Sequence, residues 1–471
     1  MKNILLIEPD YKNKYPPLGL MKISTYHKQK GHNVVFYKGC STDLRKQIWD
    51  RIYISTLFTF YWDKTIKTIK FYLNSVKDPK NIFIGGVMAT LMKEDIKKEF
   101  NINLVEGLLN EKGKLGYKDD YKIDCLLPDY KIVDPESNHL LNYSYPVIDS
   151  YIVHATRGCI RKCPFCAVPI IEPKFSNSLS IAKQVEAIKK NFGEKRNLLL
   201  MDNNILASGR FKEIIEEIKN IGFHKGAKYV VNNNGRKYYI KRYVDFNQGI
   251  DARLLTEEKM KLLSEIAIKP LRIAFDDIRF KKIYVEKVKL AAKYGIENLS
   301  NYILFNFNDT PEDFYERLKI NVELNEKFEK NGYKSRIWSF PMKYCPIKGE
   351  CSKNRKHIGE NWNKKYLRAI QCILLPTHGV VGTKKQFFEA AFGKNIKEFK
   401  KILLLPEKFI IYRNFHLNNG NRNKLDKILN SINNYQRKKI IQGILSNNFN
   451  EIELQTNNKY ILNYYKDGFT P

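Results

Sequence analysis

The stretch that decides the fold is Thr156-Arg157-Gly158-Cys159-Ile160-Arg161-Lys162-Cys163-Pro164-Phe165-Cys166. Its three thiols follow the spacing Cys-x3-Cys-x2-Cys, and the glycine and proline suit a tight loop that brings three sulfurs to one point. A tetrahedral zinc site would lack a fourth ligand here, whereas a cubic iron-sulfur cluster would keep one iron uncapped. Since an uncapped iron can bind a substrate, we expect Cys159, Cys163 and Cys166 to hold such a cluster.

These positions resemble the cluster loop of the radical S-adenosylmethionine (SAM) enzymes, with aromatic Phe165 directly before the last thiol. The resemblance implies a 4Fe-4S cluster whose fourth iron is chelated by the amino and carboxylate groups of SAM. It also implies reductive cleavage of SAM to a 5′-deoxyadenosyl radical that abstracts hydrogen from a substrate. The alternative is a set of three structural thiols, or a zinc site completed by His154 or a distant cysteine.

The length and composition of the chain restrict the possible classes of protein. A chain of 471 residues predicts two or three domains, and its 43% hydrophobic content excludes global disorder. Eight cysteines in a chain of this size do not form a disulfide framework, so we expect a reduced, cytoplasmic location. The N-terminal apolar run is too short for a signal peptide, and no stretch approaches the ~20 apolar residues of a membrane span, so no membrane partner is expected.

The formal net charge of +32 is the strongest feature of the composition. A positive field of that size attracts polyanions, and nucleic acid is the commonest polyanion. The charge therefore favours a nucleic acid or nucleotide as substrate or partner, against the alternative of an enzyme that is merely basic.

Residues 1–145 alternate short apolar strands with helical patterns, and we expect strands at 2–8, 33–37, 52–56 and 81–84 and a helix at 18–30. This alternation predicts a doubly wound (Rossmann-like) parallel sheet. The runs Tyr15-Pro16-Pro17-Leu18-Gly19-Leu20 and Phe83-Ile84-Gly85-Gly86-Val87-Met88-Ala89-Thr90 resemble the cobalamin-binding-type domain of one branch of the radical SAM family. Bound cobalamin stays open, because no Asp-x-His-x-x-Gly motif is present, and His27 and His32 are expected to be surface histidines.

Residues 146–345 are expected to form the radical SAM core, a partial (β/α)6 barrel. The cluster loop follows a first strand at 151–156. The pattern predicts further strands at 197–202, 242–247, 270–275, 299–306 and 335–340, and helices at 178–191, 210–221, 256–265, 279–294 and 311–330. Their number agrees with the barrel that the resemblance implies.

Polar residues at the ends of these strands are candidate cofactor contacts. Asp202 and Asn203 follow the second strand, where the resemblance implies an element that meets the SAM amino group; helix capping is the alternative. Asn247, Gln248 and Arg253 follow a later strand and resemble the ribose and carboxylate contacts of the family, although Arg253 could instead pair with Asp251. Asp276, after a further strand, is a candidate substrate contact.

Three features have no counterpart in the shared barrel. Segment 222–242 is a basic insertion, expected to be either a substrate lid or a solvated loop. Residues 346–471 predict a basic helical C-terminal domain, with helices at 361–375, 383–391, 395–404, 422–432 and 434–445. In the last of these helices, Arg437-Lys438-Lys439 beside Tyr435 either binds phosphate and a base or forms a solvated face. Cys345, Cys351 and Cys372 could start an auxiliary cluster but lack one ligand.

The expected function is therefore that of a radical SAM enzyme that modifies a nucleic acid or nucleotide by methylation or sulfur insertion, with a flavodoxin or ferredoxin as reductant. A radical SAM enzyme that acts on a small metabolite or peptide is the first alternative. The second is a non-catalytic nucleic-acid-binding protein whose fold is stapled by a metal.

Overall fold

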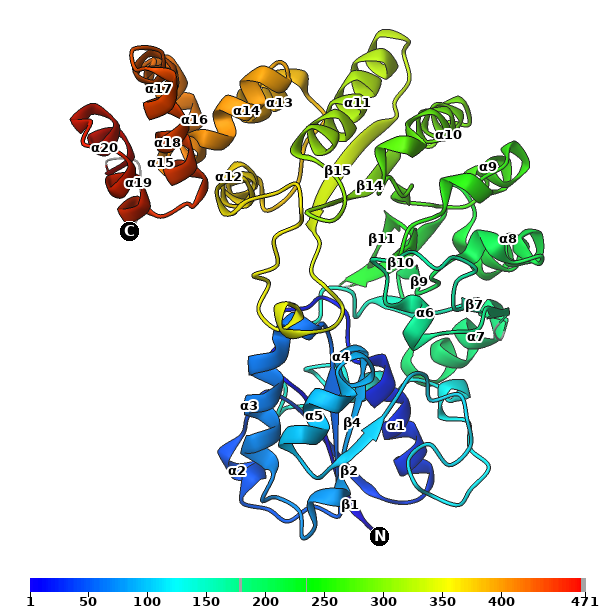
Figure 1. The fold of residues 1–471 in the computed structure, drawn as a ribbon. Coiled ribbons are helices and arrows are strands. Elements are labelled where there is room, and N and C mark those ends of the chain that lie inside the picture. Colours follow the sequence, from blue (N-terminus) through cyan, green and yellow to red (C-terminus); the bar gives the residue numbers. More distant parts are fainter. Residues whose placement is uncertain (178–179, 234, 467–471) are drawn as a thin grey trace. The chain divides into compact units, whose positions relative to one another are not determined.

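The structure is a computed structural model that describes residues 1–177, 180–233 and 235–466 (Figure 1). The chain divides into two compact units. Unit 1 comprises residues 1–250, 261–269 and 345–357, and unit 2 comprises residues 251–260, 270–344 and those from 358 onward. Both units combine segments from different predicted domains, so the division into domains 1–145, 146–345 and 346–471 stays a prediction.

Unit 1 begins with a five-stranded parallel sheet in the order β2-β1-β3-β4-β5. Residues 4–8 of the first strand are all buried, because helices cover both faces of a doubly wound sheet. The strands are β1 (Asn3–Glu8), β2 (Asn33–Lys38), β3 (Arg51–Thr56), β4 (Ile82–Gly86) and β5 (Asn103–Val105), with helices α1 (Leu18–Gln29), α2 (Thr42–Arg45), α3 (Trp62–Tyr72), α4 (Val87–Leu91) and α5 (Lys93–Glu99). The predicted doubly wound sheet is confirmed.

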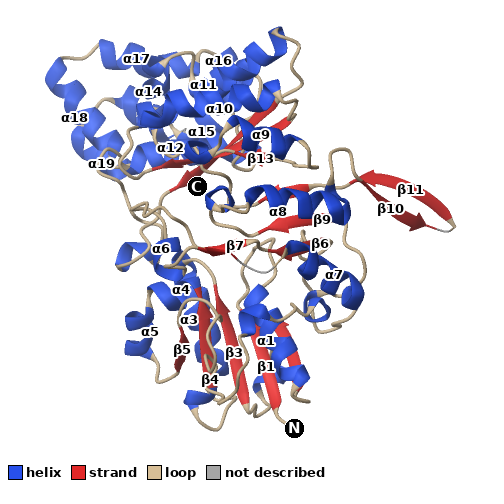
Figure 2. Ribbon diagram, turned by 90° about the vertical axis from the view of Figure 1, so that its right-hand side faces the viewer, coloured by secondary structure: helices blue, strands red, loops and turns tan. Residues whose placement is uncertain are grey.

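A second parallel sheet of unit 1, in the order β12-β9-β6, carries the cysteine loop (Figure 2). It consists of β6 (Ser150–Val153), β9 (Asn197–Leu200) and β12 (Val244–Phe246), accompanied by α7 (Ile181–Phe192) and α8 (Phe211–Ile218). The first predicted strand, 151–156, is split in two, because after β6 the chain turns into β7 (Thr156–Arg157), which pairs antiparallel with β8 (Ser176–Asn177).

Unit 2 combines a three-stranded parallel sheet with the C-terminal helices. The sheet contains β13 (Leu271–Arg272), β14 (Asn298–Phe305) and β15 (Arg336–Lys343), with α10 (Lys281–Lys293) and α11 (Pro311–Lys330). The later helices are α12 (Lys364–Leu374), α13 (Lys385–Phe392), α14 (Ile396–Leu404), α15 (Glu407–Ile411), α16 (Arg413–Asn418), α17 (Asn421–Asn430), α18 (Asn434–Leu445), α19 (Phe449–Gln455) and α20 (Lys459–Lys466). One apolar core joins α12–α15 and α17–α20 to β14 and α11. Helix α9 (Glu257–Ser264) contains the boundary between the two units.

Two expectations about local structure are corrected. Segment 222–242 is not an irregular loop, because β10 (Lys228–Asn233) and β11 (Arg236–Lys241) form an antiparallel hairpin. Aromatic and β-branched residues on both sides of a turn favour this arrangement over a loop. His27 is not on the surface: it is fully buried, and its Nε2 lies 3.0 Å from the hydroxyl of Tyr53. In the described chain no helix is both long and apolar enough to cross a membrane.

Candidate cluster-binding site

The three cysteines lie on one loop that follows the carboxyl end of β6. Cys159, Cys163 and Cys166 are each partly exposed, and none of them forms a disulfide. The backbone N–H of Cys166 donates to the carbonyl of Cys163 at 3.0 Å, which closes the turn at Pro164. The loop therefore presents three accessible thiols within eight residues, and their convergence on one cluster stays a prediction.

Gly158 determines how the chain enters this loop. Its φ is +73°, and a Cβ at this position would lie 2.4 Å from the carbonyl oxygen of Lys174, closer than side chains approach backbone. The N–H of Gly158 donates to the carboxylate of Glu172 at 2.5 Å. Only glycine can occupy this position without moving the neighbouring backbone.

Asp202 fixes the backbone just before the loop. It is 4% exposed, and its carboxylate accepts hydrogen bonds from the N–H of Ala155 at 3.1 Å and from the N–H and hydroxyl of Thr156 at 2.5 and 2.7 Å. Burial raises its pKa to about 6, although these donors favour the charged form. The structure thus gives Asp202 a positioning role, and its predicted contact with SAM stays a prediction.

Cys159 has two hydrogen-bond donors close to its sulfur. The N–H of Arg161 and the Nδ2 of Asn204 both lie 3.3 Å from Sγ. Asn204 is 4% exposed, and within the described chain its Oδ1 has no hydrogen-bond partner. Such N–H···S contacts stabilise thiolates and adjust the potential of cluster sulfurs. Sequence reasoning missed Asn204, although it directly follows the candidates Asp202 and Asn203.

A network of ion pairs connects the cysteine loop to other segments of unit 1. Asp124 lies 2.9 Å from Lys22 Nζ and 2.7 Å from an Arg157 nitrogen, and Arg157 in turn lies 3.3 Å from Glu172. Burial opposes ionisation of Asp124, but the charges of Lys22 and Arg157 outweigh it and lower the pKa of Asp124 to about 2. The first helix, the linker and the cluster loop are therefore tied together through charges within unit 1.

His154 lies next to these charges. It is 5% exposed, its Nδ1 has no partner in the described chain, and its Nε2 lies 4.0 Å from Asp124. Burial, with the charges of Arg157 and Lys22, lowers the pKa of His154 to about 3, so the imidazole is neutral at pH 7.

The three loop thiols are the candidate ligands of an iron-sulfur cluster, and their binding of a metal stays a prediction. Among residues 1–177, 180–233 and 235–466, no group of three His, Cys, Asp or Glu side chains converges as the ligands of a single metal ion do. Three accessible thiols on one loop, with N–H donors at one sulfur, match the ligands that a cluster uses. Cys159, Cys163 and Cys166 are therefore the residues that could hold it.

The remaining candidate cofactor contacts have varied surroundings. Asn203 donates from Nδ2 to Glu172 at 2.9 Å, while Asn247 is buried and accepts a hydrogen bond from the hydroxyl of Tyr15. Gln248 is exposed and Phe165 is partly exposed. Asn203, Asn247, Gln248 and Phe165 belong to unit 1, and their contacts with SAM stay predictions.

Two candidates lie in unit 2. Arg253 pairs with Asp251 at 2.7 Å, which is the structural alternative that the sequence left open, and its role with SAM stays a prediction. Asp276 is half-buried after β13, and burial raises its pKa to about 6. The fully buried Arg317 donates to the main-chain carbonyl of Asp276 at 2.9 Å and pairs with Asp309 at 2.7 Å.

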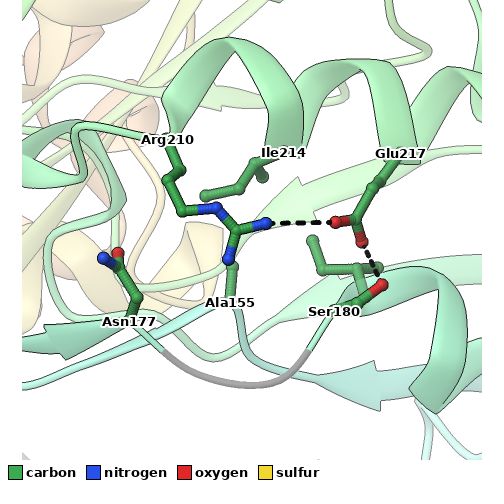
Figure 3. A pocket seen from close by; sticks show the side chains of 7 residues that line it. Ala155, Asn177, Ser180, Arg210, Ile214 and Glu217 are labelled. Atoms are coloured by element: carbon green, nitrogen blue, oxygen red, sulfur yellow. Dashed lines mark hydrogen bonds and ion pairs between the residues drawn. The ribbon is translucent and has the colours of Figure 1, made fainter.

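A small cavity near β6 lies apart from the thiols (Figure 3). In Figure 3 the guanidinium of Arg210 points toward Glu217 at 3.8 Å, and the Ser180 hydroxyl donates to the same carboxylate at 2.6 Å. The cavity has a volume of about 10 Å³, which is enough for one water molecule. It is too small for a cofactor.

The three cysteines of the predicted auxiliary cluster have different surroundings. Cys372 is 1% exposed in the apolar core of unit 2, and burial raises its pKa to about 11. Cys345 and Cys351 belong to unit 1, where the Cys345 thiol donates to the carbonyl of Ser352 at 3.6 Å. The buried Cys372 behaves as a core residue, and an auxiliary cluster stays a prediction.

The carboxyl end of the five-stranded sheet is where doubly wound folds bind ligands. There Glu8 of β1 forms a buried ion pair with Lys38 of β2 at 2.6 Å, and the hydroxyl of Tyr145 donates to Glu8. Gly86 ends β4 with φ +104°, and a Cβ there would lie 2.3 Å from the carbonyl oxygen of Thr56. Gly86 is thus required by the close approach of two strands, and it is not by itself a sign of bound cobalamin.

Comparison with solved structures identifies proteins of similar fold. The cobalamin-dependent SAM radical enzyme OxsB, solved with aqua-cobalamin and SAM bound, matches 99% of this chain and 83% of its own at 12% identity, with a TM-score of 0.52. The radical SAM methyltransferase TsrM from Kitasatospora setae, solved with tryptophan and a SAM analogue, matches 79% of this chain and 76% of its own at 13% identity, with a TM-score of 0.49. No family model and no curated protein matches this sequence.

OxsB is the more similar of these two structures in fold. At 12% identity the likeness concerns the fold, and it extends over nearly the whole chain. The chain therefore shares the fold of OxsB, which confirms the fold class that the cysteine loop and the alternating elements predict.

Proposed function

We propose that this chain is a radical SAM enzyme that cleaves SAM reductively and modifies a nucleic acid or nucleotide by methylation or sulfur insertion. The observation that carries the first half is the loop of Cys159, Cys163 and Cys166 at the carboxyl end of β6 in a fold of this type. Barrel-type α/β folds place their chemistry at this end of their strands. The net charge of +32 supports the second half.

In this proposal the three thiolates hold a 4Fe-4S cluster. When bound, the cluster supplies the electron that splits SAM into methionine and a 5′-deoxyadenosyl radical. Asn204 and the N–H of Arg161 donate to the sulfur of Cys159, and this favours its thiolate form. Asp202 holds the backbone at Thr156 and Glu172 holds it at Gly158, so the entry to the loop is shaped before the cofactor arrives.

The SAM contacts and the electron donor extend the proposal. Phe165, Asn203 and Gln248 offer partly or fully exposed side chains for SAM, whereas Asn247 would have to release the hydroxyl of Tyr15. We expect a flavodoxin or ferredoxin to deliver the electron. Cobalamin content is measured together with iron in the experiment below.

Anaerobic reconstitution tests the proposal. The wild-type chain is expected to bind about four irons and four sulfides and to release 5′-deoxyadenosine from SAM with dithionite. Ser replacement of Cys159, Cys163 or Cys166 should abolish both the brown colour and cleavage, whereas Cys40→Ser, an exposed cysteine outside the loop, should leave both unchanged.

Two outcomes would contradict the proposal. If any of the three loop variants kept both colour and cleavage, the cluster assignment would fail. A colourless wild-type chain with zinc and no iron would instead support a metal-stapled binding protein. Modification of a small metabolite or peptide, without salt-dependent binding of RNA or DNA, would overturn the nucleic-acid half alone.

A further inference from the structure

The hairpin of β10 and β11 extends away from the rest of unit 1 (Figure 2). Its root is anchored by Arg242, which is 6% exposed and donates to the carbonyls of Arg196 and Lys195 at 3.0 and 2.8 Å. The same guanidinium pairs with Glu194 at 3.1 Å and lies over the ring of Phe223 at 4.0 Å. The hairpin beyond this root extends outward, and its exposed side chains are open to a partner.

The register of the hairpin places its lysines together. Lys228 is paired with Lys241, Val230 with Tyr239, and Asn232 with Lys237. Directly opposite residues of an antiparallel pair share a face, and successive residues alternate between faces. One face therefore carries six side chains, which we call the lysine face: Lys228, Val230, Asn232, Lys237, Tyr239 and Lys241. The cation–π contact of Lys228 with the Tyr239 ring, at 6.0 Å, confirms this arrangement.

All six residues of the lysine face are exposed, including Val230 at 45% and Tyr239 at 63%. The opposite face differs, because Tyr229, Val231 and Ile240 are partly buried. Residues 225–242 contain six Lys and Arg and no Asp or Glu, so the positive charge has no neutralising partner within the hairpin.

We propose that the lysine face is a docking surface for single-stranded nucleic acid. This inference deepens the proposed function and rests on its nucleic-acid half. Along β11 the sequence Lys237, Tyr239, Lys241 repeats at roughly 7 Å, the rise of two strand residues. The lysines contact phosphates on either side of Tyr239, and the exposed ring of Tyr239 stacks on a base.

The chemistry of this face favours a nucleic acid over an acidic peptide. An acidic peptide would satisfy the lysines but would leave the exposed flat ring between them without a specific partner. A single strand supplies a charge and a π-face at each nucleotide, so it matches the alternation of cations and ring. A peptide partner is an outcome that the test distinguishes.

The test measures the binding of a 5′-fluorescein-labelled 20-nucleotide oligouridylate to the full chain by fluorescence anisotropy over a series of salt concentrations. The triple variant Lys228→Glu, Lys237→Glu, Lys241→Glu should bind at least about tenfold more weakly, with a salt slope shallower by about 2, because single strands contribute about 0.7 per phosphate contact. The matched control reverses three exposed lysines on α7 and α8 of the same unit, namely Lys183, Lys190 and Lys212. Both variants have the same net charge, and the control should lose less than about threefold.

A second pair of variants needs no charge reversal. Tyr239→Ala should weaken binding at least about fivefold through lost stacking, whereas Tyr238→Ala, on the opposite face and 49% exposed, should have little effect. If both tyrosine variants bound like wild type, Tyr239 would not contact a base. If the triple lysine variant also bound like its control, the proposed docking surface would be wrong.

These outcomes separate the inference from the proposed function. Both lysine variants should retain iron and basal SAM cleavage, since no residue of the hairpin belongs to the cluster loop. Wild-type binding that survives in the triple hairpin variant would overturn the inference alone. The wild-type chain could instead bind no oligonucleotide and capture a polyglutamate peptide through the lysine face. This result would overturn both the inference and the nucleic-acid half of the proposed function, but it would leave the proposed cleavage of SAM intact.

Discussion

Replacing Gly158 by alanine tests whether the shape of the cluster loop is set before the cofactor binds. Gly158 has φ +73°, and its new Cβ would meet the carbonyl oxygen of Lys174 at 2.4 Å and that of Glu172 at 3.0 Å. Both obstacles are backbone atoms, so no flexible side chain can move aside. The loop must therefore shift, and the 2.5 Å hydrogen bond from Gly158 to Glu172 is the first contact that it loses.

Gly193→Ala is a matched control for the backbone strain. Gly193 has φ +78°, but a Cβ there meets nothing within 4 Å. A left-handed backbone costs about 1–2 kcal/mol for a non-glycine residue, and both variants incur this cost. Gly158→Ala additionally loses a hydrogen bond to a charged group, which contributes about 1.5–3 kcal/mol. We expect Gly158→Ala to destabilise unit 1 by about 3–5 kcal/mol and Gly193→Ala by about 1–2 kcal/mol.

Two measurements check this expectation. Urea unfolding of the cluster-free chain, followed by circular dichroism under reducing conditions, compares the stabilities. Anaerobic reconstitution compares iron content, where Gly158→Ala should lose most of its iron and Gly193→Ala should keep it. Equal unfolding midpoints and equal iron in the two variants would refute the reasoning, because the close approach of Gly158 to Lys174 would then have no consequence.

Three further substitutions probe the groups around the loop. Asp202→Asn places an amide donor against the N–H of Ala155, and urea unfolding should show a loss of about 1–3 kcal/mol. Burial raises the pKa of Asp202 from 3.8 to about 6, so between these pH values the folded chain holds a proton that the unfolded chain has lost. The free energy of unfolding of wild type, relative to Asp202→Asn, should therefore fall by about 3 kcal/mol as the pH rises from 3.8 to about 6. A difference between the two chains that does not change with pH would contradict this. Asn204→Leu removes an N–H donor to Cys159 and should lower the midpoint potential of the cluster in an EPR redox titration, so an unchanged midpoint counts against the contact. Asp124→Asn leaves Lys22 and Arg157 without their shared anion and should destabilise unit 1 by about 2–3 kcal/mol. The control is Asp120→Asn, which removes an exposed carboxylate. An equal loss of stability in the control would argue against a specific role of Asp124.

The elements of the fold follow from local patterns in the sequence. Helix α11 begins at Pro311 after Thr310, whose hydroxyl accepts from the N–H of Asp313 in a capping box, and the sequence places the start of this helix at the same residue. The length of segment 222–242 indicates an insertion, and only its aromatic and β-branched residues favour the two strands that form the hairpin.

Contacts between distant parts of the chain could not be predicted in this way. Glu172 lies 14 residues from Gly158, and Asp124 lies 33 residues from Arg157, yet each pair is hydrogen-bonded. Asp202 is a polar residue after a strand, and this position is equally suitable for binding SAM and for holding Ala155 and Thr156. Only the path of the folded chain shows that its carboxylate is buried against these two residues.

The sequence by itself determined the three thiols, their spacing and the alternation of strands and helices, because these depend on residues close together in the chain. The tertiary structure decided which carboxylates hold the loop, that Asn204 reaches Cys159, and that three lysines of the hairpin share one face. Burial, register and close approach arise only when distant segments meet, so no local pattern contains them.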